Sequence, residues 1–258
     1  MTCNLSLIHI NARSMGNKLE YIEILLKTIK NNFDILAVSE TSQNYLNSHL
    51  INILGYCKVS SMRSCGAKGG GTALFVKPNF KFTVIDVTTV SFESVFIETM
   101  DLDQKIKTII GTIYRPPGTN LSFFNSELEK VIGLFTKSKV NLILLGDYNI
   151  NLLNHEVHSE TADFLNLLYA NTLLPLISKP TRYGDHSATL IDNVITNMYS
   201  QNSLYGIILD DISDHLPIFL VLGNVQNHRS TTHLKKRVRQ MNYANFDLFK
   251  IKINCVNW

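Results

Sequence analysis

Apolar residues along the chain follow two patterns, short continuous runs and runs with helical spacing. The continuous runs, rich in aliphatic and β-branched residues, predict strands at residues 5–10, 33–38, 72–76, 94–100, 107–114, 142–145 and 218–222. Helical spacing predicts amphipathic helices at residues 18–30 and 121–136 and a shorter helix at 161–169. A further β-rich run lies at about residues 80–90, and the short polar turns between neighbouring runs predict antiparallel meanders.

Two intervening segments break these patterns. Residues 41–65 are poorly patterned, and we expect a short helix and a loop there. Gly69, Gly70 and Gly71 precede the strand at 72–76. They predict a turn or bulge rather than a phosphate-binding loop, because no helix follows them.

Length and composition allow one large domain or two small ones. The chain has 258 residues, of which 45% are hydrophobic, enough for a substantial core in an α/β or β-sandwich fold. We expect an intracellular protein, because the first residues lack the pattern of a signal peptide and no apolar run approaches the length of a membrane span. The four cysteines lack zinc-ligand spacing and fit a reducing compartment.

The basic charge of the chain is concentrated in its last segment. The whole chain carries a net charge of +3, whereas residues 223–258 hold seven basic side chains and one acidic one, a balance of +6. The remainder is therefore acidic by three charges. An acidic body that contacts a polyanion would be expected to gather carboxylates around a cation.

A glycine ends the strand-like run at 142–145 and is followed by two polar side chains. We expect Gly146 to allow a backbone turn that a residue with a Cβ would resist, and Asp147 and Asn149 to point the same way. A carboxylate and an amide that converge in this way can activate a water and hold the group that it attacks. Asp-x-Asn after a strand is also an ordinary turn, and the motif alone leaves that alternative open.

Other polar residues also follow predicted strands. Asn11 follows the first strand, and Glu40 lies just beyond the strand at 33–38, which repeats the position of Asp147. Tyr114 and Arg115 precede two prolines, which fix the loop and leave both side chains little freedom. A phenol and a guanidinium there could bond a phosphate. The alternative is a capped strand with a surface arginine.

The centre of the segment at residues 187–197 is apolar and strand-like, and Asp192 interrupts it. A carboxylate inside such a strand is costly unless it is paired, so Asp192 predicts a partner. The candidate is His215, in Ser213-Asp214-His215 before the strand at 218–222, because a buried Asp192 would orient the ring and favour its charged form. A lone histidine before a strand is more often part of a surface turn, but the recurrence of polar residues at strand ends favours one shared site.

These residues lie in seven phrases that resemble the endonuclease/exonuclease/phosphatase superfamily. The closest resemblance is to the apurinic-type endonuclease domain of LINE-type, jockey-like non-LTR retrotransposons. The phrases are His-Ile-Asn-Ala-Arg-Ser (9–14), Leu-Ala-Val-Ser-Glu-Thr (36–41), Gly-Gly-Gly-Thr-Ala-Leu-Phe-Val (69–76), Tyr-Arg-Pro-Pro (114–117), Leu-Gly-Asp-Tyr-Asn (145–149), Lys-Pro-Thr-Arg with Thr-Leu-Ile-Asp (179–182, 189–192) and Ser-Asp-His-Leu-Pro (213–217). As an ordered set they are highly specific for the superfamily. Tyr-Arg-Pro-Pro, Pro-Thr-Arg and the serine before Asp214 favour the retrotransposon branch over repair enzymes.

The resemblance implies a DNase-I-like α/β fold, a four-layer sandwich of two packed, mainly antiparallel sheets flanked by helices. It implies an endonuclease domain at residues 1–222 and a basic linker or tail at 223–258, similar to the start of a connector toward a reverse transcriptase. On this resemblance we expect a truncated or fragmentary element protein, or alternatively a host-domesticated endonuclease with a DNA-binding tail. A disordered, solvated tail is compatible with both.

The resemblance also implies a role for each candidate residue. Glu40 would bind Mg²⁺, for which Mn²⁺ can substitute, with Asp214 as a second contributor and Asn11 orienting the metal or its water. Asp147 would take the proton from the attacking water. The remaining roles are phosphate binding by Asn149, Tyr114 and Arg115, neutralisation of transition-state charge by His215 held by Asp192, and supporting contacts from Thr181 and Ser213.

The implied reaction is hydrolysis of a phosphodiester bond in double-stranded DNA, at a nuclear site of action. The nick would leave a 3′-hydroxyl that primes reverse transcription. The alternatives are another phosphodiesterase of the superfamily, acting on abasic DNA, polyadenylate, sphingolipid or inositol phosphate, a decayed copy that binds DNA or a partner without catalysis, and a purely structural protein. The intact set of candidate residues argues against decay, which has no reason to spare one site.

Overall fold

The structure, a computed structural model, describes residues 5–29, 33–43, 47–61, 69–100, 107–135, 140–184, 186–198 and 203–223. The chain divides into two compact units, residues 1–224 and 225–258, and every described residue belongs to the first. The predicted basic tail therefore lies, from residue 224 onward, outside the described residues. The end of the segment at 41–65, from residue 62 and including Arg63 and Cys65, also lies outside them.

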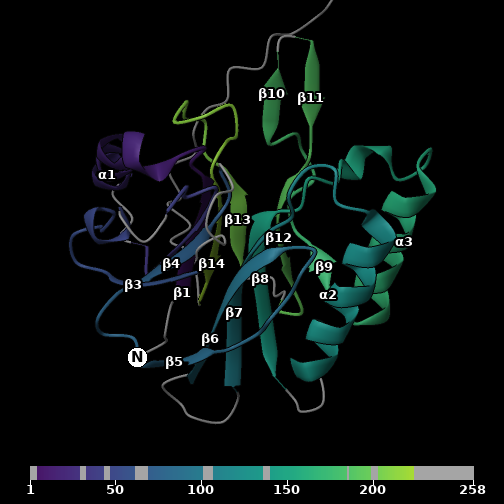
Figure 1. Cartoon of the computed structure of the whole chain (residues 1–258), viewed down its shortest axis with the longest axis horizontal. Helices are drawn as coiled ribbons and strands as arrows, with labels where there is room; N and C mark the ends of the chain where they lie inside the picture. The colour runs from purple at the N-terminus through teal and green to yellow at the C-terminus, as the bar shows by residue number, and fades with distance from the viewer. Residues whose placement is uncertain are drawn as a thin grey trace, which may run out of the picture. The chain divides into compact units, whose positions relative to one another are not determined.

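Two six-stranded sheets form the centre of the first unit (Figure 1). The strands of the first sheet are β1 (Leu5–Asn11), β2 (Ile35–Ser39), β3 (Cys57–Ser61), β4 (Thr72–Val76), β13 (Leu204–Ile207) and β14 (Ile218–Leu222). Those of the second are β5 (Phe82–Ile85), β6 (Glu93–Met100), β7 (Lys107–Tyr114), β8 (Asn141–Asp147), β9 (Leu174–Pro175) and β12 (Asp192–Thr196). The strand orders are β13-β14-β1-β2-β4-β3 and β5-β6-β7-β8-β12-β9.

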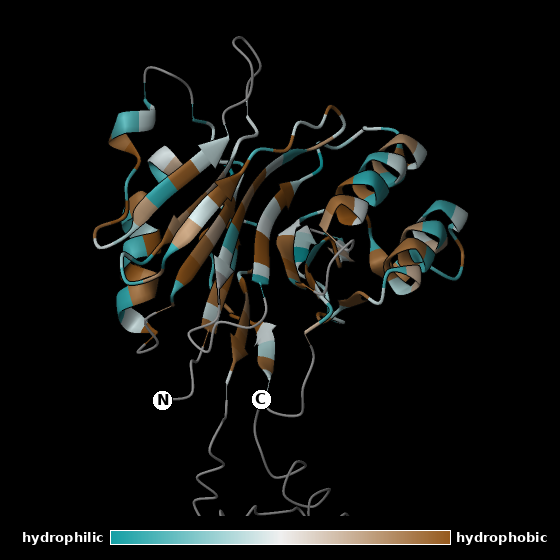
Figure 2. Cartoon of the chain, turned by 90° about the horizontal axis from the view of Figure 1, so that it is seen from below, coloured by the Kyte–Doolittle hydropathy of each residue, from teal (hydrophilic) through white to brown (hydrophobic). Residues whose placement is uncertain are grey.

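Helices cover the outer faces of both sheets. Figure 1 shows α1 (Leu19–Thr28) beside the first sheet and α2 (Leu121–Phe135) and α3 (Ser159–Ala170) beside the second. Three short 3-10 helices lie at Met15–Asn17, Ser48–Leu50 and Leu152–Asn154. In Figure 2 the strands are largely hydrophobic, whereas the helices carry both hydrophobic and hydrophilic faces. This arrangement is the predicted four-layer α/β sandwich.

Alternation along the strands of the first sheet divides its side chains between two cores. Leu7 and Ile35 pack with residues of the second sheet, whereas Ile8 and Leu36 pack in a separate cluster with Ile22 of α1. Successive side chains on a strand point to opposite faces. Polar residues that share the parity of the inter-sheet residues therefore lie between the two sheets.

Each sheet has one parallel pair at its centre, and this pairing brings the candidate residues to one rim. β1 pairs with β2 and β7 with β8 in parallel, and all other described pairs are antiparallel. The carboxyl ends of a parallel pair share one edge, and an antiparallel neighbour brings its first residue there. The rim gathers residues from the ends of β1, β2, β7 and β8 and from the starts of β12 and β14: Asn11, Glu40, Tyr114, Asp147, Asp192 and His215.

The structure departs from the predicted elements mainly at edges. Residues 57–61 form the edge strand β3 instead of a loop, and β9 and β13 were not predicted. The strand-like centre of the segment at 187–197 is β12, as expected, whereas its first residues form β11 (Ser187–Thr189), which pairs with β10 (Arg182–Gly184) as a hairpin that projects above the rim in Figure 1. Edge strands and hairpins are partly exposed and need no apolar run, so the pattern does not reveal them.

Candidate active site

The carboxylate of Asp147, at the last position of β8, is the centre of the rim. Only 1% of Asp147 is exposed. Its Oδ2 accepts hydrogen bonds from Asn11 Nδ2 at 2.9 Å and from Asn149 Nδ2 at 3.2 Å, and its Oδ1 accepts one from the backbone N–H of Asn149 at 2.9 Å. The contact with the Asn149 backbone is the local turn left open by the motif. The local turn is therefore present, and the carboxylate of Asp147 and the amide of Asn149 also converge, as expected.

The expectation that Gly146 forms a turn was wrong. β8 continues through Gly146 to Asp147, and the positive φ lies at Asn149, at 49°. A Cβ on Gly146 would lie 2.0 Å from the carbonyl oxygen of Ile113 on the neighbouring strand. Glycine is required here because β7 and β8 approach closely, not because the chain turns.

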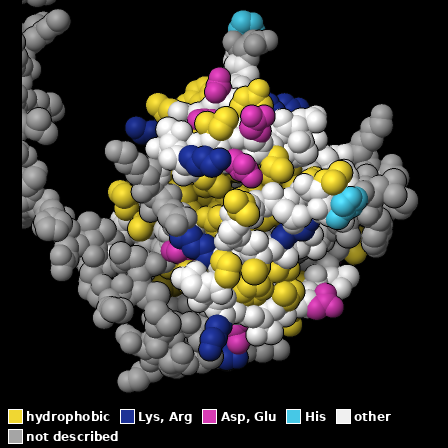
Figure 3. All heavy atoms as spheres, turned by 90° about the vertical axis from the view of Figure 1, so that its left-hand side faces the viewer, with side chains coloured by type: hydrophobic (Ala, Val, Ile, Leu, Met, Phe, Trp, Pro, Cys, Tyr) yellow, Lys and Arg dark blue, Asp and Glu magenta, His cyan; other side chains and the backbone are white. Residues whose placement is uncertain are grey.

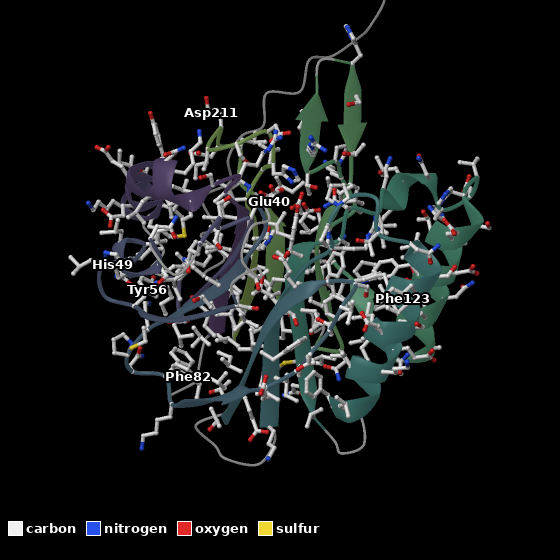
Figure 4. The ribbon with its side chains drawn as sticks, in the orientation of Figure 1. Glu40, His49, Tyr56, Phe82, Phe123 and Asp211 are labelled. Atoms are coloured by element: carbon white, nitrogen blue, oxygen red, sulfur yellow. The ribbon has the colours of Figure 1, made fainter. Side chains whose placement is uncertain are left out.

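The amide of Asn11 joins the two acidic residues of the rim. Its Nδ2 donates to Glu40 Oε1 at 2.9 Å as well as to Asp147, and its Oδ1 accepts from the backbone N–H of Arg13 at 3.1 Å. Figure 4 shows Glu40 at the upper rim, where the two sheets meet. Asn11 therefore fixes the spacing between the carboxylates of Glu40 and Asp147.

Backbone strain is concentrated in the loops of the same rim. Five of the six described non-glycine residues with positive φ follow β1, β2 or β8, namely Arg13, Ser14, Glu40, Ser42 and Asn149. Such conformations cost free energy and persist only where the surrounding structure holds them. The backbone N–H groups of Thr41 and Ser42 donate to the carbonyls of Gly71 and Gly70, which holds the segment around Glu40.

Asp192 and His215 form the predicted pair. His215 Nδ1 lies 2.9 Å from Asp192 Oδ2, and both residues are buried. Thr181 Oγ1 donates to the same oxygen at 2.8 Å. Ser213 Oγ donates to the carbonyl of Asn11 at 2.8 Å and accepts from the backbone N–H of His215 at 3.1 Å. Thr181 and Ser213 thus hold the pair and its loop against the end of β1.

Burial and neighbouring charge shift the pKa values of these groups. Burial lowers the pKa of His215, but the charge and hydrogen bond of Asp192, with the charges of Asp147 and Asp214, outweigh it and leave the pKa above its usual value. Burial raises the pKa of Asp147 to about 8, and the charge of Asp192 adds to this, while His215 opposes it. The carboxylates of the rim therefore have too little positive charge around them.

A divalent cation fits this shortage of positive charge. Glu40, Asp147 and His215 offer ligand atoms that lie within 4.8 Å of one another. Carboxylate oxygens suit hard divalent cations, whereas an imidazole that is protonated has no lone pair for a metal. The two carboxylates of this group match a cation, and a charged His215 beside them matches an anion.

Two predicted residues use their charge on other partners. The Asp214 carboxylate accepts from Arg13 Nη1 at 2.9 Å and from Arg182 Nε at 2.8 Å, and these bonds outweigh burial and lower its pKa.

Arg115 is buried, so the alternative of a capped strand with a surface arginine was wrong. Its guanidinium donates to the carbonyl oxygens of Tyr148, Thr119 and Asn149, which fixes the loop after β8. Tyr114 is buried and pairs with Asp147 across β7 and β8.

The structure adds two features that the sequence analysis did not single out. A pocket of about 380 Å³ adjoins Asn149 and Arg115 and is lined by residues at the starts of α2 and α3, among them Asn120 and His158. His9 is buried on β1, with Nδ1 3.9 Å from Asp192 Oδ1, and burial lowers its pKa to about 4. His9 could have been singled out from the sequence, because this histidine interrupts an apolar strand in the same way as Asp192 does.

Comparisons with known proteins agree with the fold and with the family resemblance. A family model described as endonuclease-reverse transcriptase matches residues 108–219. No curated protein matches the chain. None of the helices in the described ranges is long and apolar enough to cross a membrane.

Three solved structures show the fold. The endonuclease domain of TRAS1, a telomere-specific non-LTR retrotransposon, matches with a TM-score of 0.68 at 13% sequence identity. The match covers 85% of this chain and 98% of the TRAS1 chain. The AP endonuclease LMAP from Leishmania major has a TM-score of 0.67 at 13% identity, covering 85% and 88%. TDP2 from D. rerio, complexed with a single-strand DNA product, has a TM-score of 0.61 at 14% identity, covering 84% and 98%. These structures confirm the predicted DNase-I-like fold, and the family model over residues 108–219 bears out the resemblance to endonuclease-reverse transcriptases.

Proposed function

Taking the endonuclease-reverse transcriptase family as the premise, we propose that this chain is a metal-dependent endonuclease that hydrolyses a phosphodiester bond in double-stranded DNA. One observation carries the proposal: the carboxylates of Glu40 and Asp147 converge on one amide, and His215 lies beside them. Hydrolysis needs an activated water, neutralisation of the growing negative charge and a stabilised leaving oxygen. The rim offers groups suited to each need.

The protein's own residues divide these tasks. Asp147, held by two asparagine side chains, accepts the proton of the attacking water. Asn149 and Tyr114, on either side of Asp147, bind the scissile phosphate, and Arg115 supports the loop that carries Asn149. His215, held by Asp192, neutralises the negative charge that grows on the phosphate in the transition state. Thr181 and Ser213 keep this pair in place.

Mg²⁺ is the proposed cation, and Mn²⁺ can substitute for it because both accept carboxylate oxygens. Glu40 holds the ion, and Asn11 fixes the Glu40 carboxylate relative to Asp147. When bound, the ion polarises a phosphate oxygen. Asp214 is proposed as a second contributor, for which its carboxylate must turn from Arg13 or Arg182.

The described surface gives a reason for the cation. In Figure 3 lysine and arginine side chains are scattered among acidic and hydrophobic ones, without a continuous basic surface on the part of this face that the structure describes. Contact with a polyanion usually relies on such a surface. Residues 1–222 as a whole are acidic by three charges, so the proposal takes the positive charge from the cation, from His215 and from the basic residues after 222.

We propose further that the nick leaves a 3′-hydroxyl that primes reverse transcription at a chromosomal site in the nucleus. The family description, which names reverse transcriptase, supports a reverse transcriptase module as partner. In this proposal residues 1–222 are the endonuclease domain, and residues 223–258 are the basic linker toward that module.

Nicking of supercoiled plasmid tests the proposal. The full chain is expected to relax the plasmid with Mg²⁺ and not with chelator, and Asp147→Asn is expected to lower the rate about 10²- to 10³-fold. Asp163→Asn, which changes an exposed carboxylate on α3, is the matched control and should leave the rate unchanged.

The product end and a second substrate make the test specific. A DNA polymerase should extend the nick without prior phosphatase treatment, which reports a free 3′-hydroxyl. Cleavage confined to an abasic oligonucleotide would favour a repair-type activity instead. A wild-type protein that is folded by circular dichroism yet gives no metal-dependent nicking would refute the proposal.

A further inference from the structure

The imidazole of His9 lies behind the Asp192–His215 pair and has no role in the proposed reaction. His9 is 1% exposed and lies on the face of β1 turned toward the second sheet. Its Nε2 is 3.1 Å from Ser39 Oγ on β2, and its Nδ1 is 3.9 Å from Asp192 Oδ1 on β12. One ring therefore lies between the two sheets and faces the acid that holds His215.

The two oxygens of Asp192 are used unequally. Oδ2 bonds both His215 and Thr181, whereas Oδ1 is buried and accepts no hydrogen bond from any residue within the described ranges. A buried carboxylate oxygen without a donor is costly. His9 Nδ1 is the nitrogen that the structure places opposite Oδ1.

The contact with Ser39 is compatible with a His9 ring that carries its proton on Nδ1. If the Ser39 hydroxyl donates to Nε2, the neutral ring carries its hydrogen on Nδ1, the atom that faces Asp192. The separation of 3.9 Å exceeds a hydrogen bond, so the attraction at this distance is electrostatic. A small movement of either side chain would bring His9 Nδ1 and Asp192 Oδ1 within hydrogen-bonding distance.

We propose that His9 is a positioning residue for phosphodiester hydrolysis. Its Nδ1–H faces Asp192 Oδ1 and holds the carboxylate, so that Asp192 Oδ2 keeps the His215 ring in place. The Nε2 of His215 is then left for the substrate. This inference rests on the proposed function. In the simpler account His9 only fills the space between the sheets, and any variant that packs equally well would serve.

Two substitutions separate the two contacts of the ring. The amide nitrogen of asparagine takes the place of Nδ1, and that of glutamine takes the place of Nε2. His9→Asn therefore keeps a donor toward Asp192 and loses Ser39, whereas His9→Gln keeps Ser39 and loses the donor. We expect His9→Gln to lower kcat about 10- to 100-fold, the range found when a group that orients a catalytic residue is removed, with KM nearly unchanged. His9→Asn should stay within about threefold of wild type on the same argument.

Thr196→Val is the matched control for stability. Thr196 is buried on the same strand and the same face as Asp192, and its Oγ1 donates to the carbonyl of Leu142, away from the rim. The variant should lower the melting temperature without changing kcat. If all three variants instead lost activity in proportion to their melting temperatures, His9 would have only a packing role.

NMR of the full chain in chelator tests the same link without activity. The His215 Nδ1 proton, bonded to Asp192, should give a resonance at low field in wild type and in His9→Asn, and should shift upfield or broaden in His9→Gln. An unchanged resonance in His9→Gln would overturn the proposal. If wild type fails to nick DNA, the proposed function fails, and this comparison still decides whether His9 positions His215.

Discussion

A single amide determines how two acids face each other at the rim. Asn11 uses one nitrogen to donate to both Glu40 and Asp147, so its donor function, not its polarity, is what the site requires. A buried carboxylate that loses its donor keeps its desolvation cost without compensation. Replacing Asn11 by an isosteric acceptor isolates this effect.

Asn11→Asp is expected to lower the free energy of unfolding by about 1–3 kcal/mol in chelator, because a third carboxylate replaces the shared donor. Asn151→Asp is the matched control, since Asn151 accepts through Oδ1 from the backbone N–H groups of Leu153 and Leu190, a function that aspartate keeps. Urea denaturation measures both. Equal stability of Asn11→Asp and wild type would show that the amide does not balance the two acids.

Among the elements, the parallel pair of β7 and β8 sets the position of Asp147 and Tyr114. The pair is close enough at Gly146 that a Cβ would meet the backbone of Ile113 at 2.0 Å, and backbone atoms cannot rotate away. The strands must separate or shift to admit even a methyl group. Overpacking of this kind is destabilising and would move the two rim residues at the ends of the pair.

Gly146→Ala is therefore expected to destabilise the protein by about 1–3 kcal/mol or more and to reduce nicking with it. Gly133→Ala, on α2, adds the same methyl group where no atom beyond the neighbouring helix backbone lies within 4 Å, and should stabilise by about 0.5–1 kcal/mol through helix propensity. Thermal melts and nicking rates compare the two. A tolerated Gly146→Ala would mean that β7 and β8 can part without cost.

What the sequence predicted, and what it did not, also divides by element. The helices and the central strands are buried on one or both faces and therefore carry a complete apolar pattern. That periodicity was enough to predict them from the sequence. The edge strands β3, β9 and β13 pair on one side only and need no such pattern. Polar residues at the ends of central strands were found for the same reason that those strands were. The partners of Asp214, and the Tyr148 and Asn149 carbonyls that Arg115 binds, could not be predicted, because they come from segments that only the fold brings near.

In the described unit as a whole, the two sheets contribute separately to the rim and are joined there by polar groups. Asn11 and Glu40 come from the first sheet, and Asp147 and Asp192 from the second. The apolar core between the sheets holds them together below this point. A cation held by Glu40 beside Asp147 would balance the acidic groups that the two sheets bring together at the rim, and it would bind the folded state but not the unfolded chain, which lacks the converging carboxylates.

A divalent cation is therefore expected to raise thermal stability, by an amount that grows with the logarithm of its concentration relative to the Kd. At a concentration a hundredfold above the Kd, linkage gives about 2.7 kcal/mol, which for a domain of this size is a rise in Tm of about 5–10 °C. Differential scanning calorimetry with Mg²⁺ and with Mn²⁺ measures this rise in Tm.

Glu40→Gln, which keeps the acceptor for Asn11, should remove most of the rise, and Asp163→Asn should keep it. A smaller rise in Asp214→Asn would support Asp214 as a second contributor, whereas an unchanged rise would leave Glu40 as the residue that holds the ion. Since Asn11 already spaces the two carboxylates, a rise that survives in Glu40→Gln would mean that the cation binds elsewhere, and the metal assignment at this rim would have to be abandoned.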